Sequence, residues 1–169
     1  AGASATVAVS IGPAATTLIV GTYNDTVSFI NTSNGAGNAA RSVALTVTTH
    51  GALSVNPIGN LASTGPVGGP FAPASLTYTL TNTGGQAIGW TAAKTQTWTT
   101  LSATTGTLNA GASATVAVSI GPEANALIIG TYNDAVNFTN TANGTLYAAR
   151  SVVLTVTTPG ALSVTPIGN

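Results

Sequence analysis

The chain has 169 residues, of which six are charged at neutral pH, and its formal net charge is zero. Charged residues make up 4% of the sequence, against about 25% in an ordinary soluble domain. Three cations cannot form the basic face that nucleic-acid binding requires, and the absence of cysteine excludes disulfides and thiolate metal sites. The apolar content of 44% predicts a folded protein whose surface consists of small uncharged side chains.

Short apolar segments of period two predict β-strands throughout the chain. In each segment Val, Ile, Leu or an aromatic residue alternates with a small or polar residue. In chain order these segments are residues 7–11, 52–55, 76–80, 88–90, 116–120, 136–138 and 152–156. Asn- and Gly-rich turns separate them, and residues 60–73, which are rich in Gly and Pro, are predicted to form a loop. No segment keeps a helical period, so the predicted fold class is all-β.

The chain contains an internal repeat with a period of 109 residues. Residues 1–60 align without gaps on residues 110–169, and 46 of the 60 aligned positions are identical. A period of this length corresponds to about one domain. The sequence therefore predicts one and a half copies of a repeated domain.

Strands of this length and spacing predict tandem immunoglobulin-like (Ig-like) sandwiches of two antiparallel sheets. We expect residues 50–158 to form one complete Ig-like repeat, residues 1–49 the C-terminal half of a preceding repeat, and residues 159–169 the start of the next. A half sandwich leaves an apolar sheet face open, and a sheet of two or three strands is marginally stable in water. Two explanations stay open: the chain is part of a longer array, or a neighbouring subunit completes the half sandwich.

Residues 52–156 resemble the bacterial Ig-like domains of the BACON family (Bacteroidetes-associated carbohydrate-binding, often N-terminal). The resemblance rests on residues 76–120, which include an Asn-Thr-Gly-Gly turn and two tryptophans, on the Gly-Thr-Tyr segment within residues 130–141, and on residues 150–156. It implies a bacterial extracellular or cell-surface protein in which such domains occur in tandem. It also implies a role as a spacer or stalk, because the family has no set of catalytic residues.

We expect neither catalytic nor metal-binding residues. His50, the single histidine, aligns with Pro159, and Glu123 replaces an alanine of the first copy, so neither belongs to a mechanism shared by both copies. The recurring acids, Asp25 and Asp134, are too few for hydrolysis by two carboxylates or for an acidic calcium site. The sequence therefore predicts no enzyme activity, no cofactor and no metal.

Two charges recur in both copies, the carboxylate of Asp25 and Asp134 and the guanidinium of Arg41 and Arg150. Strand parity places all four side chains toward the interior, where an unpaired charge is costly. A hairpin around residues 143–144 is expected to hold Asp134 and Arg150 near its opposite ends. We predict structural roles for these charges, with partners from backbone amides or from an adjacent unit.

Most aromatic side chains share strand parity with aliphatic core positions. Trp98, Tyr147 and Phe71 are the candidate surface aromatics for ligand contact, although a core position is favoured for Trp98. Scattered rings of this kind make a weak platform for sugar binding. No apolar run approaches the roughly 20 residues of a transmembrane helix.

The sequence thus favours a non-enzymatic structural repeat of an extracellular stalk, an adhesin shaft or a polymeric filament. Its expected partners are copies of itself or adjacent repeats, bound through end-to-end or strand-completing contacts, with no nucleic acid among them. Almost no edge charge opposes such strand pairing. The alternatives are a carbohydrate-binding or adhesive module, with glycans as partners, and a spacer repeat of a larger secreted enzyme.

Overall fold

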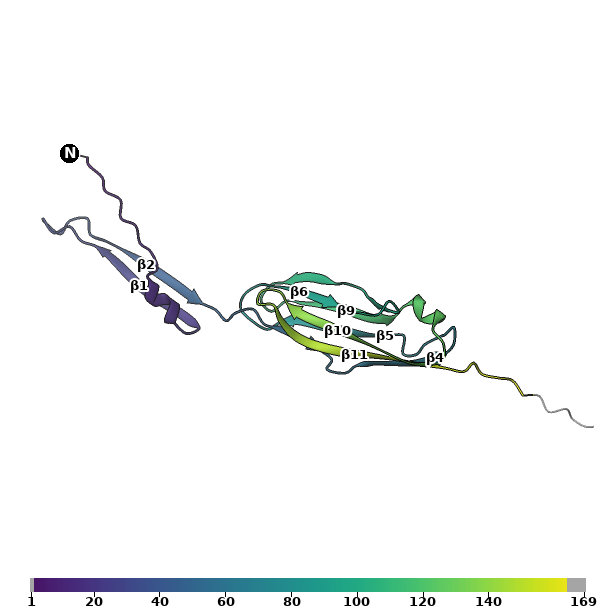
Figure 1. Ribbon diagram of the computed structural model, residues 1–169. Helices are drawn as coiled ribbons and strands as arrows, with labels where there is room; N and C mark the ends of the chain where they lie inside the picture. Colours follow the sequence, from purple (N-terminus) through teal and green to yellow (C-terminus); the bar gives the residue numbers. More distant parts are fainter. Residues whose placement is uncertain (1, 164–169) are drawn as a thin grey trace, which may run out of the picture. The chain divides into compact units, whose positions relative to one another are not determined.

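The computed structural model describes residues 2–163 (Figure 1). The chain divides into two compact units, unit 1 (Ala1–Thr49) and unit 2 (His50–Asn169). Apart from two short 3-10 helices, η1 (Pro13–Thr17) and η2 (Pro122–Ala126), the regular elements are strands. The all-β class predicted from the sequence is therefore confirmed.

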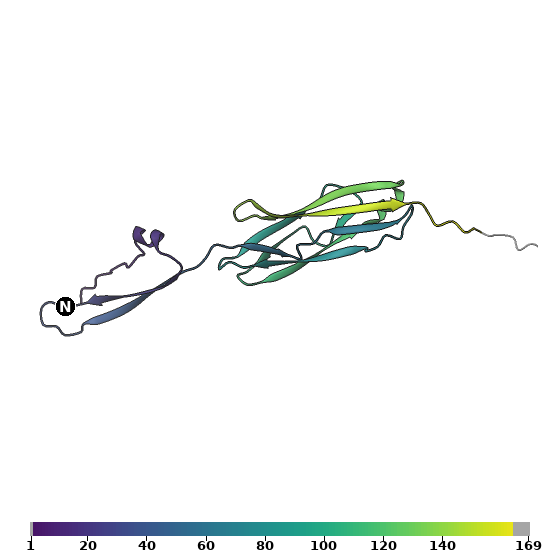
Figure 2. The ribbon, with the colours of Figure 1, turned by 90° about the horizontal axis from the view of Figure 1, so that it is seen from below.

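Unit 2 is a sandwich of two sheets, which Figure 2 shows as two layers. One sheet has the strand order β4-β11-β10-β6-β8 and the other has the order β3-β5-β9-β7. The strands are β3 (Leu53–Asn56), β4 (Leu61–Pro66), β5 (Ser75–Asn82), β6 (Ile88–Ala93), β7 (Thr99–Leu101), β8 (Thr105–Leu108), β9 (Ser113–Ile120), β10 (Gly130–Asn140) and β11 (Thr145–Thr157). The order β3-β5-β9-β7 corresponds to the A-B-E-D sheet of an Ig domain, and β11-β10-β6 to its G-F-C sheet, so the fold is Ig-like.

Alternate side chains of both sheets meet in one core. Val136 and Phe138 of β10 and Leu154 of β11 are fully buried from one side, and Tyr78 of β5 and Val116 of β9 from the other. The rings of Tyr78 and Phe138 lie 5.6 Å apart at 59°, a tilted arrangement that aromatic pairs favour. The period-two patterns of these strands therefore identified the buried face correctly.

The chain enters unit 2 at one end of the sandwich and leaves it at the other (Figure 1). At the entry end, the Gly51 carbonyl accepts a hydrogen bond of 3.3 Å from the Asn140 side chain, and Asn140 pairs with Thr145 at the start of β11. At the exit end, the carbonyl of Thr157 accepts a hydrogen bond of 3.0 Å from the Val67 amide. The length of β11 thus separates the entry end from the exit end.

Three segments differ from the sequence-based predictions or extend beyond them. Residues 61–66 form β4, which pairs in parallel with β11, although residues 60–73 were predicted to be a loop. The small Ala, Ser and Thr side chains of β4 give a weak alternation, and its pairing with β11 compensates for this. Residues 7–11, predicted to be a strand, have no regular structure. Of the predicted start of a next repeat, residues 159–163 have no regular structure, and residues 164–169 lie outside the described part of the chain.

Unit 1 consists of η1 and a hairpin of β1 (Gly21–Phe29) and β2 (Ala39–Val47), which pair antiparallel. None of the described residues 2–49 is buried. In unit 2 the counterpart of residues 7–11 lies in β9, where it pairs with both β5 and β7. Residues 2–49 contain no such neighbouring strands, which explains why residues 7–11 stay irregular there.

Candidate functional site

One face of the β1–β2 hairpin is apolar and is not covered by any described strand of unit 1. The register of the hairpin places its side chains on one side of the sheet, because residues opposite each other in an antiparallel pair share a face. We call this the open face, and its members are Tyr23, Val27, Phe29, Val43, Leu45 and Val47, with Asp25 and Arg41 between them. Phe29 is 37% exposed. Val9 and Ile11 line a hollow of about 230 Å³ on this face.

The counterparts of the open face in unit 2 form the core. Val27 and Phe29 correspond to Val136 and Phe138, which are both fully buried. Every position whose side chain the structure describes as buried within residues 110–158 carries the same residue in residues 1–49, although the two copies differ elsewhere. In unit 2 these twelve positions are Val116, Val118, Gly121, Ala124, Asp134, Val136, Phe138, Asn140, Ala148, Val152, Leu154 and Val156. The two copies therefore share the buried side chains that, in unit 2, pack against residues 53–108.

The Asp134 carboxylate in unit 2 has partners from outside its own strand. Its Oδ1 accepts hydrogen bonds from the Thr95 amide at 3.0 Å, the Thr95 hydroxyl at 2.7 Å and the Ala135 amide at 2.8 Å. Burial is the largest single influence and raises the pKa of Asp134, but the contacts with Thr95, Thr99 and Ala135 outweigh it, so the pKa lies below its ordinary value of 3.8. In unit 1, Asp25 keeps the local bond, a 2.7 Å contact from the Thr26 amide.

We expect Asp134→Asn to lower the free energy of unfolding of unit 2 by about 1–2 kcal/mol at pH 7. A carboxylate whose folded pKa is lowered stabilises the fold above its unfolded pKa and loses this effect as the pH falls through the folded pKa. The difference between wild type and variant should therefore begin to shrink as the pH falls below the ordinary pKa of 3.8 and should be lost once the pH is below the lowered pKa of the folded state. Urea unfolding followed by tryptophan fluorescence at pH 7 and pH 2 measures both values.

Asp25→Asn is the matched control for this prediction. It removes the equivalent carboxylate from unit 1 and should leave the unfolding of unit 2 unchanged at both pH values. If the free energies of unfolding of Asp134→Asn and wild type differ by the same amount at pH 7 and pH 2, the ionised carboxylate contributes nothing to the stability of unit 2.

The Arg150 guanidinium joins β11 to the chain around β3. Nη2 donates to the Val55 carbonyl at 2.9 Å and Nε to the Pro57 carbonyl at 3.1 Å, and the group lies 5.9 Å from the centre of the Tyr78 ring. Arg41 in unit 1 retains the local bond, from Nη1 to the Ala40 carbonyl at 2.8 Å. The recurring arginine thus has distant partners in unit 2, where β3 lies within reach.

The predicted separation of Asp134 and Arg150 along the hairpin is wrong. Asp134 pairs with Val152 and Arg150 pairs with Val136, so the two charged residues are diagonal neighbours in the middle of the β10–β11 ladder. The reason is that both residues lie at similar distances from the turn between β10 and β11. Each nevertheless binds the groups described above, and no ion pair between these two described residues is found.

Of the three candidate surface aromatics, Tyr147 is exposed, with 50% of its surface accessible. It lines a hollow of about 150 Å³ beside Leu53 and Asn140. Trp98 is 3% exposed and packs in the core, which confirms the favoured core position and makes its candidacy as a surface aromatic wrong. Phe71 is partly buried and packs against the same core. A single exposed ring does not provide the coplanar platform that sugar binding requires.

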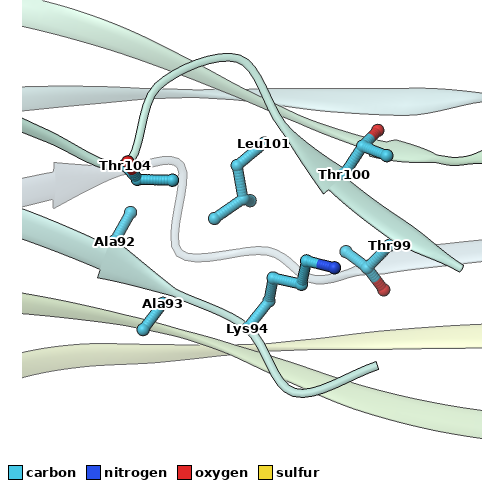
Figure 3. Close-up of a pocket in the computed structure, with 7 residues that line it drawn as sticks. All are labelled: Ala92, Ala93, Lys94, Thr99, Thr100, Leu101 and Thr104. Atoms are coloured by element: carbon cyan, nitrogen blue, oxygen red, sulfur yellow. The ribbon is translucent and has the colours of Figure 1, made fainter. Parts of the chain in front are cut away.

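A shallow hollow of about 430 Å³ lies between β6 and β7 (Figure 3). Its lining residues are Ala92, Ala93, Lys94, Thr99, Thr100, Leu101 and Thr104. Lys94 is the one charged residue among them, and its Nζ donates to the Gln96 carbonyl at 2.8 Å. No carboxylate or imidazole is among these lining residues. The hollow offers hydroxyl groups and an amine for hydrogen bonding.

Asn82 is an organising residue that the sequence-based reasoning missed. Its side chain is fully buried, and Nδ2 donates to the carbonyls of Gln86 at 2.7 Å and Leu108 at 3.0 Å. Its Oδ1 accepts from the amides of Ala52 at 3.2 Å and Gly84 at 3.0 Å. The available signal was the Asn-Thr-Gly-Gly turn, because Asn at the start of a turn commonly bonds the amide two residues on.

Within residues 2–163, no group of three or more His, Cys, Asp or Glu side chains is placed to hold a metal ion. No helix in that part of the chain is long and apolar enough to cross a membrane.

Comparisons with known proteins return structural similarities at low sequence identity. No protein-family model and no curated protein matches the chain. Among solved structures, WR4 of Caenorhabditis elegans, an MSP family member, matches with a TM-score of 0.39 and 11% identity, over 64% of this chain and 100% of that chain. The E. coli chaperone DraB matches with a TM-score of 0.43 and 9% identity, over 64% of this chain and 56% of that chain. A Porphyromonas gingivalis protein of unknown function matches with a TM-score of 0.43 and 12% identity, over 83% of this chain and 67% of that chain. The Ig-like assignment rests on the strand order of unit 2.

Proposed function

We propose that this chain is a non-enzymatic structural repeat of an extracellular stalk, adhesin shaft or polymeric filament, built from BACON-like Ig sandwiches. The observation that carries the proposal is the position of the chain ends in unit 2. Because the chain enters at the Gly51 end and leaves beyond Thr157 at the other end, successive units joined in this way extend along a line. The 109-residue repeat supplies the successive units.

Exposed apolar residues at the exit end support end-to-end contact between units. Ile128 and Ile129 are 74% and 57% exposed, and they directly precede Gly130, which pairs with Val156 near the end of β11. Val67, which is 40% exposed, donates its amide to Thr157 at the same end. Large apolar side chains gathered at one end of a domain indicate a contact surface. In an array, the next unit begins at this end and would cover them.

Tandem chains with two, three and four copies of residues 50–158 test the proposal. Since β11 has 13 residues and a strand rises about 3.3 Å per residue, each added copy should lengthen the particle by about 40 Å. Small-angle X-ray scattering and electron microscopy measure this increment. Replacing Ile128 and Ile129 by serine in every copy should widen the distribution of angles between successive units. The unfolding midpoint should stay unchanged, because both side chains are exposed.

The matched control for this pair of substitutions is Thr131→Ser, which changes an exposed residue on the adjacent strand. Particles that collapse to a globular shape, or whose length does not grow in proportion to the number of copies, would contradict the stalk. Specific binding of the tandem chain on a glycan array, lost on Tyr147→Ala, would favour the adhesive module instead.

A further inference from the structure

We propose that residues 1–49 form a donor half that completes the sandwich of a second copy of this chain. We call residues 1–49 and residues 110–158 the donor halves, and residues 51–109 the acceptor half. In unit 2 the acceptor half is completed by the donor half that follows it. The open face of unit 1 fits the acceptor half of another copy in the same register. This inference rests on the proposed function and names the partner of its strand-completing contacts.

The first argument is that the two donor halves have the same binding surface. All twelve positions that the structure describes as buried in the second donor half carry identical residues in the first. The described positions at which the copies differ are exposed or half-buried in unit 2. Examples are Glu123, Ala135 and Tyr147. An acceptor half therefore meets the same core side chains whichever donor half it binds.

The polar contacts of the interface are preserved in the same way. Asp25 and Arg41 retain their local bonds, to the Thr26 amide and the Ala40 carbonyl. Their counterparts add bonds with the acceptor half: Asp134 accepts from the Thr95 amide, and Arg150 donates to the carbonyl of Val55. The donor half of unit 1 therefore presents a carboxylate and a guanidinium at the positions where an acceptor half supplies their partners.

The second argument is that the first donor half cannot close the acceptor half of its own chain. In that arrangement Val47 would take the place of Val156, at the exit end of the sandwich. Gly51 lies at the entry end, where it meets Asn140, which pairs with Thr145. The eleven residues from Thr145 to Val156 span about 35 Å, whereas the four from Val47 to Gly51 reach about 14 Å at most.

A longer connection would require β3 to leave its sheet. Spanning about 35 Å takes about ten extended residues, and these would include all of β3 (Leu53–Asn56). Leu53 and Val55 would then lose their places in the core, where they are 3% and 2% exposed. The first donor half therefore cannot close residues 51–109 of its own chain, whereas the acceptor half of a second copy imposes no such limit on the connection.

The energetics predict when this exchange is populated. In the wild type, the first donor half of one copy competes with the second donor half of the other copy for an equivalent set of contacts. Association also costs translational and rotational entropy, so monomers dominate in dilute solution and exchanged copies increase with concentration. A copy whose second donor half is disabled has a vacant acceptor half. Binding of another copy's first donor half to this vacant half completes the core of the sandwich.

Two matched substitutions on the full chain test the proposal. Val27→Asp and Val136→Asp place a carboxylate at the same core position of the first and the second donor half. Each disables its own half, because a buried charge without a partner is strongly destabilising. The double variant, V27D/V136D, has a vacant acceptor half and no competent donor half. Its unit 2 should be unfolded when it is alone, with the fluorescence of Trp90 and Trp98 shifted to that of exposed tryptophan.

Wild-type chain added to the double variant should form a 1:1 complex, with twice the mass of the 16.4 kDa chain by light scattering. The tryptophan emission of the double variant should return to that of the folded state. V27D, which keeps a closed unit 2 but lacks a competent first donor half, is the control and should bind the double variant roughly a hundredfold more weakly or not at all. V136D alone should form head-to-tail oligomers, because each copy has a competent first donor half and a vacant acceptor half.

Several outcomes would overturn the proposal. These are equal binding of wild type and V27D to the double variant, a folded monomer of V136D, or no complex between wild type and the double variant. If the double variant aggregates, V27D/V136A replaces it, with the same expected complex and the same overturning result. The proposed function has a separate readout, because a constant length increment in tandem chains does not depend on exchange between copies. If the length increment is absent but the 1:1 complex forms, the proposed stalk function fails and the exchange between copies stands.

Discussion

Phe138→Ala is expected to lower the free energy of unfolding of unit 2 by about 3–5 kcal/mol, whereas Phe29→Ala should leave it unchanged. The two residues occupy the same position of the repeat. Phe138 is fully buried and lies 5.6 Å from the Tyr78 ring, so its truncation opens a cavity between the sheets. Phe29 is 37% exposed on the open face and is not part of the core of unit 2.

Urea unfolding followed by tryptophan fluorescence measures this difference. Both tryptophans of the chain, Trp90 and Trp98, are 3% exposed in unit 2, so the signal reports the unfolding of that unit. Dilute protein keeps exchange between copies low. Equal destabilisation by the two substitutions under these conditions would mean that residues 1–49 belong to the core of unit 2, contrary to the structure.

Asn82→Ala is expected to lower the free energy of unfolding of unit 2 by about 3 kcal/mol. The substitution removes four hydrogen bonds and leaves the carbonyls of Gln86 and Leu108 and the amides of Ala52 and Gly84 without their partner. These four groups belong to the chain before β3, the β5–β6 turn and the end of β8. A buried polar group that loses its partner costs more than the bond itself contributed.

The control for Asn82→Ala is Asn133→Ala, which removes an exposed amide from β10 and should change the free energy of unfolding by about 0.5 kcal/mol or less. Guanidinium unfolding and hydrogen exchange at the Ala52 and Gly84 amides provide the two readouts. Exchange rates at both amides that match the wild type would show that Asn82 does not hold this end of the sandwich.

Strand parity predicted the core of unit 2 well because each strand has one buried and one exposed face. Tyr78, Trp90 and Phe138 share parity with aliphatic residues, and all three are buried. Parity gave no such guide for Trp98, which precedes the short strand β7, or for β4, whose residues are mostly small. The burial of these elements depends on neighbours that are distant in sequence, as the parallel pairing of β4 with β11 shows.

The partners of the recurring charges were also beyond prediction from the sequence. Parity placed Asp134 and Arg150 toward the interior, and the cost of an unpaired charge required partners for them. Asp134 is bound by Thr95 and Arg150 by Val55, because the segment after β6 and the strand β3 lie beside the β10–β11 hairpin. Such proximity arises from the stacking of two sheets and leaves no periodic signal.

By itself the sequence determined the all-β class, the 109-residue repeat and the alternation that separates inner from outer side chains. Only the tertiary structure decided which of these inner side chains are buried. Val136 is fully buried and Val27 is only partly buried, although both lie in nearly identical segments. The physical reason is that a side chain is buried only where a second surface packs against it. In unit 2, residues 53–108 provide that surface for residues 110–158.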